Sequence, residues 1–454
     1  MHYMNQANAH NATQDTTMQD SATHDTATKA TQDTAPLKGI TVIDWTQVQS
    51  GPSCTQMLAW MGADVIKVEP PTGDSNRGIG LARHIYNGDQ AGWDSINSCK
   101  RCITLDTRKP EGLAILKEML KDCDVFLSHL RPKDSKKLGL DYESLSKINP
   151  KIICGNTSGY GTKGEWAPRG GFDAASYAAR AGYDLDCPIK GDNPMIPYFG
   201  FGDIPTGTYL AMAVLAAYIE QQRTGKGQEV NVALMHAGMW SVGVPIVTAA
   251  YGDEYPTDPN SVLPLARPYM CSDEKAIALM GLQWHNSWPE FVHAFGMDED
   301  LIAKWPDYQT ALAASAEITP IITEVLANVT RDEAIEKLMT TDIPFDLCQH
   351  FADLQDDQQA WDAGFFQGID YPSGKHIGIV KAPAIFSSGE AELGPSGYPG
   401  EYTREVLKEY GFDDAKIDEL REQGLVTEED QWDKDQYNME KLMAQAAAAK
   451  KKAE

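Results

Sequence analysis

The chain has no long apolar run and few basic side chains, and each absence excludes a class of protein. No stretch of the 454 residues approaches the ~18 consecutive apolar residues that a membrane-spanning helix needs. The N-terminus has no basic region followed by an apolar core, so no secretory signal is expected there. Lys and Arg number 39 against 65 Asp and Glu, a net charge of −26. That field repels nucleic acid and anionic membrane, so we expect neither as a partner.

Cysteine is too scattered to build a disulfide framework. The eight cysteines stand at positions 54, 99, 102, 123, 154, 187, 271 and 348, a spacing that suits reduced thiols in the cytoplasm. The C-x-x-C from Cys99 to Cys102 lacks a second pair spaced for zinc, so no metal site is expected. Cys54 stands at the start of an expected helix, where a thiol can be activated, and it remains an alternative nucleophile.

Several common catalytic signatures are also missing. G-x-S-x-G, the P-loop lysine motif and H-E-x-x-H do not occur, which removes the usual serine hydrolases, nucleotide phosphatases and zinc proteases. Residues 159–164, G-Y-G-T-K-G, have the spacing of a dinucleotide-binding turn and follow an expected strand. Residues 165–171 then read as a loop instead of the helix that such a turn requires. We therefore expect a flexible loop beside a ligand, not a nicotinamide site.

Alternating strands and helices predict an α/β fold with a parallel sheet. Residues 39–45 form a buried strand, residues 53–61 a helix and residues 63–69 a second strand, which together make a βαβ unit. The loop over residues 46–52 then lies at the carboxyl end of a strand, where such sheets bind ligands. Further strands are expected in R-C-I-T-L-D, D-V-F-L-S, K-I-I-C-G-N-T-S and E-V-N-V-A-L.

The two ends and the later part of the chain differ in texture from this pattern. Residues 1–35 hold almost no large apolar side chains and are expected to form a disordered tail. A long buried helix is expected over 203–222. From about 260 to 345 the pattern becomes mixed α+β, which predicts a second domain, and residues 375–412 return to strand, loop and helix.

Asp173 is the first candidate for chemistry. It lies in P-R-G-G-F-D-A-A-S-Y, where two glycines and an aromatic precede it and small residues follow. A carboxylate at such a bend can act as a nucleophile on a bound thioester, although Asp beside Gly also suits a turn or helix cap. Residues 100–137 hold ten Lys or Arg against six Asp or Glu, which fits either a small anionic ligand or solvated helix faces.

Motifs in a fixed order run from residue 37 to about 425. They are L-K-G-I-T-V-I-D-W-T-Q-V-Q-S-G-P, N-S-C-K-R-C-I-T-L-D, S-H-L-R-P-K-D-S-K-K-L-G-L, N-P-K-I-I-C-G-N-T-S-G-Y-G, G-F-D, T-G-K-G-Q-E-V-N-V-A-L and D-I-P-F. Together they resemble the family III coenzyme A transferases of the CaiB/BaiF type. The resemblance implies a homodimer of two interlocked ring-like chains, with a Rossmann-like large domain built from both chain ends and a smaller α+β domain. In this chain the large, CoA-binding domain is expected over 36–225 and 375–445, linkers and the small domain over 226–374, and a tail over 446–454.

The same resemblance implies roles for individual residues. Asp173 takes the position of the family's catalytic aspartate. The residues expected to contact the coenzyme are Gln49 and Ser50 after the first strand; Leu105, Arg108, His129, Leu130, Arg131 and Lys137 around adenine and phosphates; and Ser158, Gly159, Tyr160 and Gly161 beside the pantetheine arm. Pro70 stands where some members place a phosphate-binding Arg, and Arg77 and Arg83 are the candidate replacements.

The expected activity is transfer of CoA from an acyl-CoA donor to a carboxylic acid through an aspartyl-CoA thioester, with CoA thioesters as substrates and no permanently bound cofactor. Residues 342–374 most resemble transferases of 2-hydroxy acids and aryl-acrylates, with carnitine and bile-acid transferases as alternatives. An α-methylacyl-CoA racemase is the other candidate, but it needs a second base and no His lies between His129 and His236. Trp284 and Trp288 are candidates for an acyl pocket or for core packing.

Overall fold

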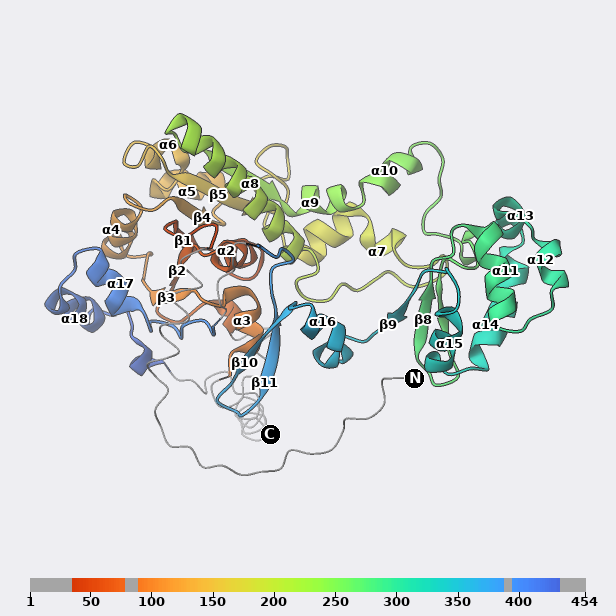
Figure 1. Ribbon diagram of the computed structural model, residues 1–454. Coiled ribbons are helices and arrows are strands. Elements are labelled where there is room, and N and C mark those ends of the chain that lie inside the picture. Colours follow the sequence, from red (N-terminus) through yellow and green to blue (C-terminus); the bar gives the residue numbers. More distant parts are fainter. Residues whose placement is uncertain (1–34, 78–88, 388–393, 433–454) are drawn as a thin grey trace, which may run out of the picture.

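The computed structural model describes residues 35–77, 89–387 and 394–432 (Figure 1). The expected tails therefore lie outside the described residues, apart from residue 35, and so does Arg83. Within the described part, no helix is long and apolar enough to cross a membrane.

A six-stranded parallel sheet organises the first part of the molecule. Its strands are β1 Thr41–Trp45, β2 Asp64–Glu69, β3 Arg101–Thr104, β4 Val125–Ser128, β5 Ile153–Ser158 and β6 Glu229–Ala233. Their spatial order is β3-β2-β1-β4-β5-β6, which is the order of a Rossmann-type doubly wound sheet. The chain adds strands on one side of β1 first and on the other side from β4 onward, so the strand order reverses between β1 and β4. The sheet includes β6, so it extends past residue 225, where the sequence suggested that the large domain ends.

Helices cover both faces of this sheet because its strands are apolar on both sides. Val42 packs with helices α2 Ser50–Trp60 and α8 Asp203–Thr224, whereas its neighbour Ile43 packs with the opposite set. That opposite face is covered by α4 Pro110–Met119, α6 Tyr142–Leu145, α17 Thr403–Glu409 and α18 Asp414–Glu422. The end of the chain thus returns to the sheet with which the chain began.

Helix α2 begins at Ser50, three residues before the expected start. The reason is that Pro52, which sequence reasoning placed in the preceding loop, is tolerated in the first turn of a helix. The loop after β1 is therefore only residues 46–49. The shorter elements of this part are η1 Ser75–Arg77, α3 Ala91–Asn97, α5 Pro132–Leu138, the π-helix η3 Asp173–Ala179, α7 Tyr183–Asp186, α9 Leu234–Ser241 and α10 Gly243–Ala249.

A separate core surrounds a three-stranded antiparallel sheet of β7 Pro268–Met270, β8 Ala276–Leu279 and β9 Phe345–Cys348. Its helices are η4 Pro259–Ser261, α11 Trp284–Ala294, α12 Asp300–Lys304, α13 Tyr308–Ala313, α14 Ser315–Ala327 and α15 Arg331–Leu338. Trp284 and Trp288 stack with centroids 5.0 Å apart inside this core. Their indole N–H groups donate to the carbonyls of Trp305 and Leu301, so core packing is their role.

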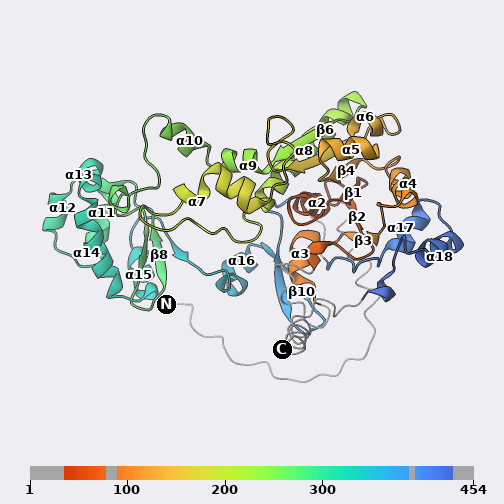
Figure 2. The same ribbon diagram turned by 180° about the vertical axis from the view of Figure 1, so that it is seen from behind.

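Two connecting stretches join the parts, and the molecule is elongated (Figures 1 and 2). One passes through α10, and the other through η5 Asp353–Asp356 and α16 Gln358–Asp362. A hairpin of β10 Phe366–Asp370 and β11 His376–Val380 then reaches α3, where the Tyr371 hydroxyl donates to Asp94 at 2.8 Å. The last described element is η6 Glu429–Gln431.

Candidate functional site

The loops that follow the parallel strands line two adjoining cavities. The first, of about 400 Å³, is walled by residues after β1, β4 and β5 and by Asp203 at the start of α8. The second, of about 330 Å³, lies beside the ends of β2 and β3. Gln47, His129 and Leu130 line both cavities. Ligands of doubly wound sheets bind at this edge and at the strand-order reversal, so the two cavities together form one candidate groove.

Asp173 is held in a fixed orientation beside the first cavity. Its side chain is 7% exposed. One carboxylate oxygen accepts the Gly200 N–H at 2.9 Å and the other accepts the Ala174 N–H at 2.7 Å. Phe172, just before it, is exposed and lines the cavity. The carboxylate is therefore oriented by backbone donors and stands one residue from the cavity wall.

A close crossing of backbone places Asp173 against the loop after β5. A Cβ on Gly159 would lie 2.7 Å from the Cα of Gly171, and one on Gly171 would clash with the Ser176 hydroxyl. Only glycine allows the two segments to approach this closely. The crossing leads into the π-helix η3, a rare form that is frequent at functional sites.

A second carboxylate, Asp203, was missed by sequence reasoning. It is 6% exposed, lines the first cavity and is hydrogen-bonded to the Ser50 hydroxyl. Burial, and then the negative charge of Asp173, raise the pKa of Asp203 to about 7. The available signal was an acidic residue at the start of the long helix, directly after the glycine-rich G-F-G.

Most of the residues that sequence reasoning assigned to coenzyme binding lie in the walls of the groove. The first cavity is lined by Ser50, His129, Leu130, Arg131, Ser158, Gly159 and Gly161, and the second by Leu105 and Arg108 together with His129 and Leu130. Arg169, which the sequence did not single out as a ligand residue, also lines the first cavity and stacks on Trp166 at 4.0 Å.

Three assigned residues lie outside those walls. Gln49 is buried next to Gly200, and its side-chain oxygen has no hydrogen-bond partner within the described residues. Tyr160 packs edge-on against Trp166, with centroids 5.2 Å apart. Lys137 is exposed on α5.

Of the two candidates for the arginine missing at Pro70, Arg77 is not available, and Arg83 lies outside the described residues. The buried guanidinium of Arg77 bonds both carboxylate oxygens of Glu69 at 2.8 Å and also donates to Gln90 and to the Gly397 carbonyl. Trp93 covers it at 4.0 Å. A cation paired and enclosed in this way is unavailable to a ligand. Pro70 itself lines the second cavity with Arg108, whose side chain is 80% exposed.

A cluster of buried charged side chains packs against the loop after β1 and is hydrogen-bonded to its backbone. The Lys67 ammonium donates to the Thr46 carbonyl and pairs with Asp74 at 3.2 Å and with Asp44 at 3.8 Å. Burial alone would raise the pKa of Asp44, but Lys67 and Lys100 hold it well below its usual range. Since paired buried charges resist the loss of either partner, this cluster holds the loop in place.

Two titratable groups near the site have shifted pKa values. His129 is solvent-exposed at the cavity wall, yet the surrounding protein and the charge of Lys67 lower its pKa, so its ring is neutral near pH 7. Cys54 is fully buried, and burial together with Asp44 raises the pKa of its thiol far above its usual range. A buried, protonated thiol is not a nucleophile, which removes Cys54 as the alternative.

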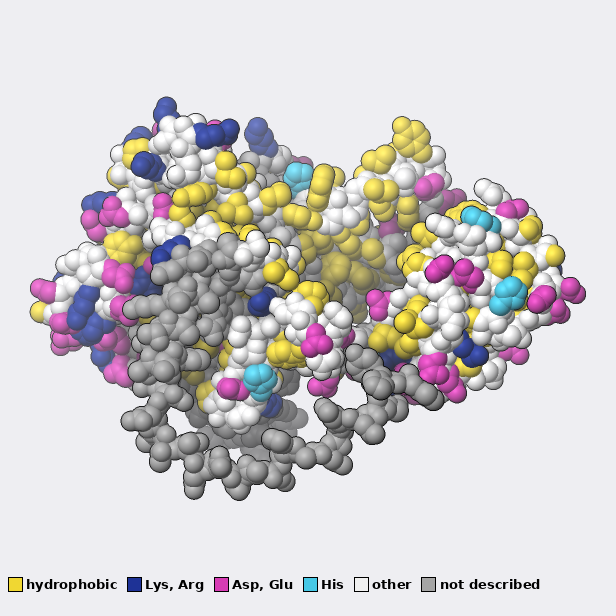
Figure 3. All heavy atoms as spheres, in the orientation of Figure 1, with side chains coloured by type: hydrophobic (Ala, Val, Ile, Leu, Met, Phe, Trp, Pro, Cys, Tyr) yellow, Lys and Arg dark blue, Asp and Glu magenta, His cyan; other side chains and the backbone are white. Residues whose placement is uncertain are grey.

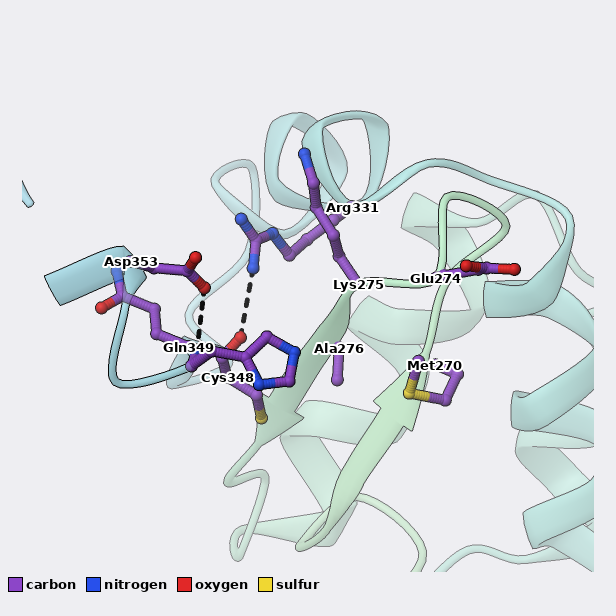
Figure 4. A pocket seen from close by; sticks show the side chains of 9 residues that line it. Met270, Glu274, Lys275, Ala276, Arg331, Cys348, Gln349 and Asp353 are labelled. Atoms are coloured by element: carbon purple, nitrogen blue, oxygen red, sulfur yellow. Dashed lines mark hydrogen bonds between the residues drawn. The ribbon is translucent and has the colours of Figure 1, made fainter. Parts of the chain in front are cut away.

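Another cavity, of about 400 Å³, lies on the three-stranded sheet of the smaller part (Figure 4). Arg331 donates to the Cys348 carbonyl at 3.2 Å there, and the His350 N–H donates to Asp353 at 2.9 Å. Its walls carry Lys275 and Arg331 but also Glu274 and Asp353, so the charges balance. Among the described residues, no three His, Cys, Asp or Glu side chains gather as a metal site.

Comparison with known proteins places the chain in a family. The model of CoA-transferase family III matches residues 37–399. The chain is 31% identical over 400 residues to (R)-2-hydroxy-4-methylpentanoate CoA-transferase of Clostridioides difficile, covering 86% of this chain and 99% of that protein. It is 32% identical over 394 residues to cinnamoyl-CoA:phenyllactate CoA-transferase of Clostridium sporogenes, covering 85% and 95%.

More distant relatives agree. Formyl-CoA:oxalate CoA-transferase of Escherichia coli is 29% identical over 420 residues, covering 86% of this chain and 99% of that protein. The crystal structure of a CaiB/BaiF family protein from Brucella suis superposes with a TM-score of 0.74 at 26% identity, covering 83% of this chain and 99% of that one. The chain therefore belongs to CoA-transferase family III. It is an enzyme of the CoA-transferase class, which uses CoA thioesters as substrates.

Proposed function

We propose that Asp173 is the nucleophile of the transfer and carries the coenzyme as an aspartyl-CoA thioester. The observation that supports this most is the Asp173 carboxylate, oriented by the N–H groups of Gly200 and Ala174 beside the groove. The carboxylate attacks the donor carbonyl and forms a mixed anhydride as the CoA thiolate leaves. The thiolate then attacks the Asp173 carbonyl and releases the donor acid. The acceptor acid repeats the two steps in reverse and leaves as the new thioester.

The walls of the groove suit a long anionic coenzyme. Arg131 and Arg169 in the first cavity supply positive charge for phosphates inside a strongly acidic protein, and the second cavity holds Arg108, whose exposed guanidinium pairs with Asp106. We assign the adenine and phosphate end to the second cavity, beside Leu105, and the pantetheine arm to the first, beside residues 158–161. The unpartnered oxygen of Gln49 is an acceptor for a ligand, because buried polar atoms ordinarily have partners.

Trapping the covalent intermediate tests the nucleophile. Enzyme incubated with a donor thioester and quenched with hydroxylamine should carry a hydroxamate on the peptide that contains Asp173, as read by mass spectrometry. Asp173→Asn should abolish both adduct and turnover, while the exposed Asp186→Asn control on α7 keeps both. An adduct that persists in Asp173→Asn, or its absence from active wild-type enzyme, contradicts the assignment.

We propose 2-hydroxy acids or aryl-acrylates as the exchanged acids. Residues 342–374 motivate this, as do the names of two relatives that act on 2-hydroxy-4-methylpentanoate and on phenyllactate. Carnitine and bile acids are the alternative. A panel of donor thioesters and acceptor acids decides between them, since the preferred acceptor should show the highest kcat/KM; a preference for carnitine or a bile acid would reject the 2-hydroxy acid assignment.

One observation keeps a racemase as the second candidate. His129 lies in the cavity beside Asp173, and its lowered pKa leaves a neutral base there. Two bases flanking an acidic α-carbon can exchange its proton. An acyl-CoA incubated in deuterium oxide without acceptor acid should keep its α-hydrogen if the protein acts only as a transferase, whereas deuteration supports a racemase.

We further propose a homodimer in the cytoplasm. Apolar side chains gather in the middle of the molecule near α9 and α10 (Figure 3). They include exposed Trp240, Val244, Val247 and Tyr251. Exposed apolar patches of this kind mark protein interfaces. None of the eight cysteines, all of which lie among the described residues, forms a disulfide bond, as is usual for a reducing compartment.

A further inference from the structure

Two carboxyl groups from different elements share one buried corner of the groove. Gly200, whose N–H holds Asp173, lies three residues before Asp203. Both side chains are more than nine-tenths buried, and the charge of Asp173 acts directly on Asp203. Asp203 faces the cavity that we assign to the pantetheine arm. Two like charges so placed oppose each other's ionisation.

The surroundings of Asp203 do not compensate its charge. From α2 the Ser50 hydroxyl bonds to it, which favours the anion slightly, and from η3 the Asp173 carboxylate opposes the anion. His129, Arg131 and Arg169 line the same cavity, but no ion pair joins Asp203 to any Lys or Arg that the structure describes. Two titratable groups on the neighbouring elements, His236 on α9 and Glu229 on β6, are solvent-exposed. These surroundings raise the pKa of Asp203 to about 7, so its carboxyl can hold a proton near neutral pH.

We propose that Asp203 is a second catalytic carboxyl that protonates the CoA thiolate when it leaves and takes the proton back when the thiol attacks. The proposal rests on Asp173 being the nucleophile. In the first step the donor C–S bond breaks, an Asp173 oxygen–carbon bond forms, and the Asp203 O–H proton passes to sulfur. Asp173 is then uncharged and Asp203 becomes the carboxylate. In the second step the thiol attacks the Asp173 carbonyl, its proton returns to Asp203, and the donor acid leaves as its anion.

The physical basis is that the two carboxyl groups together carry one negative charge throughout the exchange, on Asp173 before acylation and on Asp203 after it. Acylation removes the charge of Asp173, which is the charge that opposes ionisation of Asp203. Asp203 therefore becomes a stronger acid at the moment when sulfur needs a proton. A thiol pKa of about 8.5 lies close enough for transfer in both directions. The anion RS⁻ is thereby kept from escaping into water during the exchange.

The pH dependence of kcat/KM tests the proposal. For wild-type enzyme the value should fall as pH rises through about 7, because Asp203 loses its proton in the free enzyme. Asp203→Asn keeps the shape and a hydrogen-bond donor but cannot transfer a proton. It should lower kcat/KM by about 10²–10⁴-fold and remove the alkaline decline. Asp203→Glu should recover part of the rate and the decline. An Asp203→Asn enzyme with wild-type kcat/KM and the same alkaline decline overturns the proposal.

Two further measurements separate this proposal from its alternatives. If wild-type enzyme gives no Asp173 hydroxamate, the nucleophile assignment fails; if wild type and Asp203→Asn form the hydroxamate equally fast with equal pH dependence, only the role of Asp203 fails. A purely structural role at the start of α8 predicts a lower Tm for Asp203→Asn and an unchanged pH profile. The raised pKa of Asp203 stabilises the fold below pH about 4 and loses this effect as pH rises through about 7. The difference in Tm between Asp203→Asn and wild type should therefore shift in favour of the variant as pH rises from about 4 to about 7.

Discussion

The role of a single residue in this protein follows from the groups that surround it in the folded structure. Asp173 and Arg77 were both candidates from the sequence, and the structure separates them. The first stands beside a cavity with backbone donors on both oxygens, and the second is enclosed by Glu69 and Trp93. No local pattern reveals the difference, because the group that neutralises a charge is defined by distance through space.

The assignment of Arg77 to structure has a measurable consequence. Arg77→Met leaves the Glu69 carboxylate buried without its partner, so the free energy of unfolding should fall by about 3–5 kcal/mol. Arg108→Met removes an exposed guanidinium from the second cavity. Because this guanidinium pairs with Asp106 at 2.7 Å from a largely exposed position, its loss should cost less stability than the loss of Arg77, and it should raise the KM for acyl-CoA. Urea unfolding and steady-state kinetics on both variants give the comparison. A raised KM with unchanged stability in Arg77→Met would show that Arg77 contacts the coenzyme after all.

At the scale of secondary structure, the candidate site is lined by the loops that follow the parallel strands. The strand and helix pattern of residues 39–69 was predicted from apolar periodicity, since a buried parallel strand reads as a continuous apolar run. The π-helix after Asp173 was not predicted, because its form depends on the crossing of Gly171 with Gly159 and Ser176. That crossing fixes where Asp173 lies relative to the loop after β5.

A methyl group at the crossing should displace Asp173, the proposed nucleophile. Gly171→Ala must push apart the two segments, at a cost of about 1–3 kcal/mol. A small displacement of Asp173 should then lower kcat/KM at least about tenfold. Gly243→Ala on α10 is the control, because a Cβ there meets nothing within 4 Å. Thermal unfolding and kinetics should show loss of activity in the first variant alone. Full activity in a destabilised Gly171→Ala enzyme would mean that the crossing does not position Asp173.

At the scale of the whole molecule, several large apolar side chains remain exposed on the surface of the single chain. Within the described residues, two connecting stretches that carry the short helices α10, η5 and α16 join the two cores (Figures 1 and 2), and several apolar side chains near α9 and α10 are exposed. Three other features also belong to the whole molecule: the strand order, the inclusion of β6 in the sheet, and the packing of α17 and α18 against that sheet. Periodicity could not give them, because it describes which face of an element is buried and not which partner buries it.

Disrupting the exposed patch tests the proposed dimer. Val247→Asp places a charge among Trp240, Val244 and Tyr251, where association would have to desolvate it. The variant should shift from dimer to monomer in light scattering after size exclusion. Ile148→Asp, a half-exposed position after α6, should remain dimeric. A wild-type monomer, or a dimeric Val247→Asp, would count against an interface at this patch.

The amino-acid sequence by itself determined the α/β class and the first βαβ unit, because these depend on neighbours along the chain, and the ordered motifs that resemble the family made Asp173 the candidate nucleophile. Only the tertiary structure decided that Asp203, thirty residues further on, shares its corner with Asp173, and that Arg77 is held by Glu69. The physical reason is that burial and charge interactions act across space, so the protonation and availability of a side chain follow from which elements pack against it.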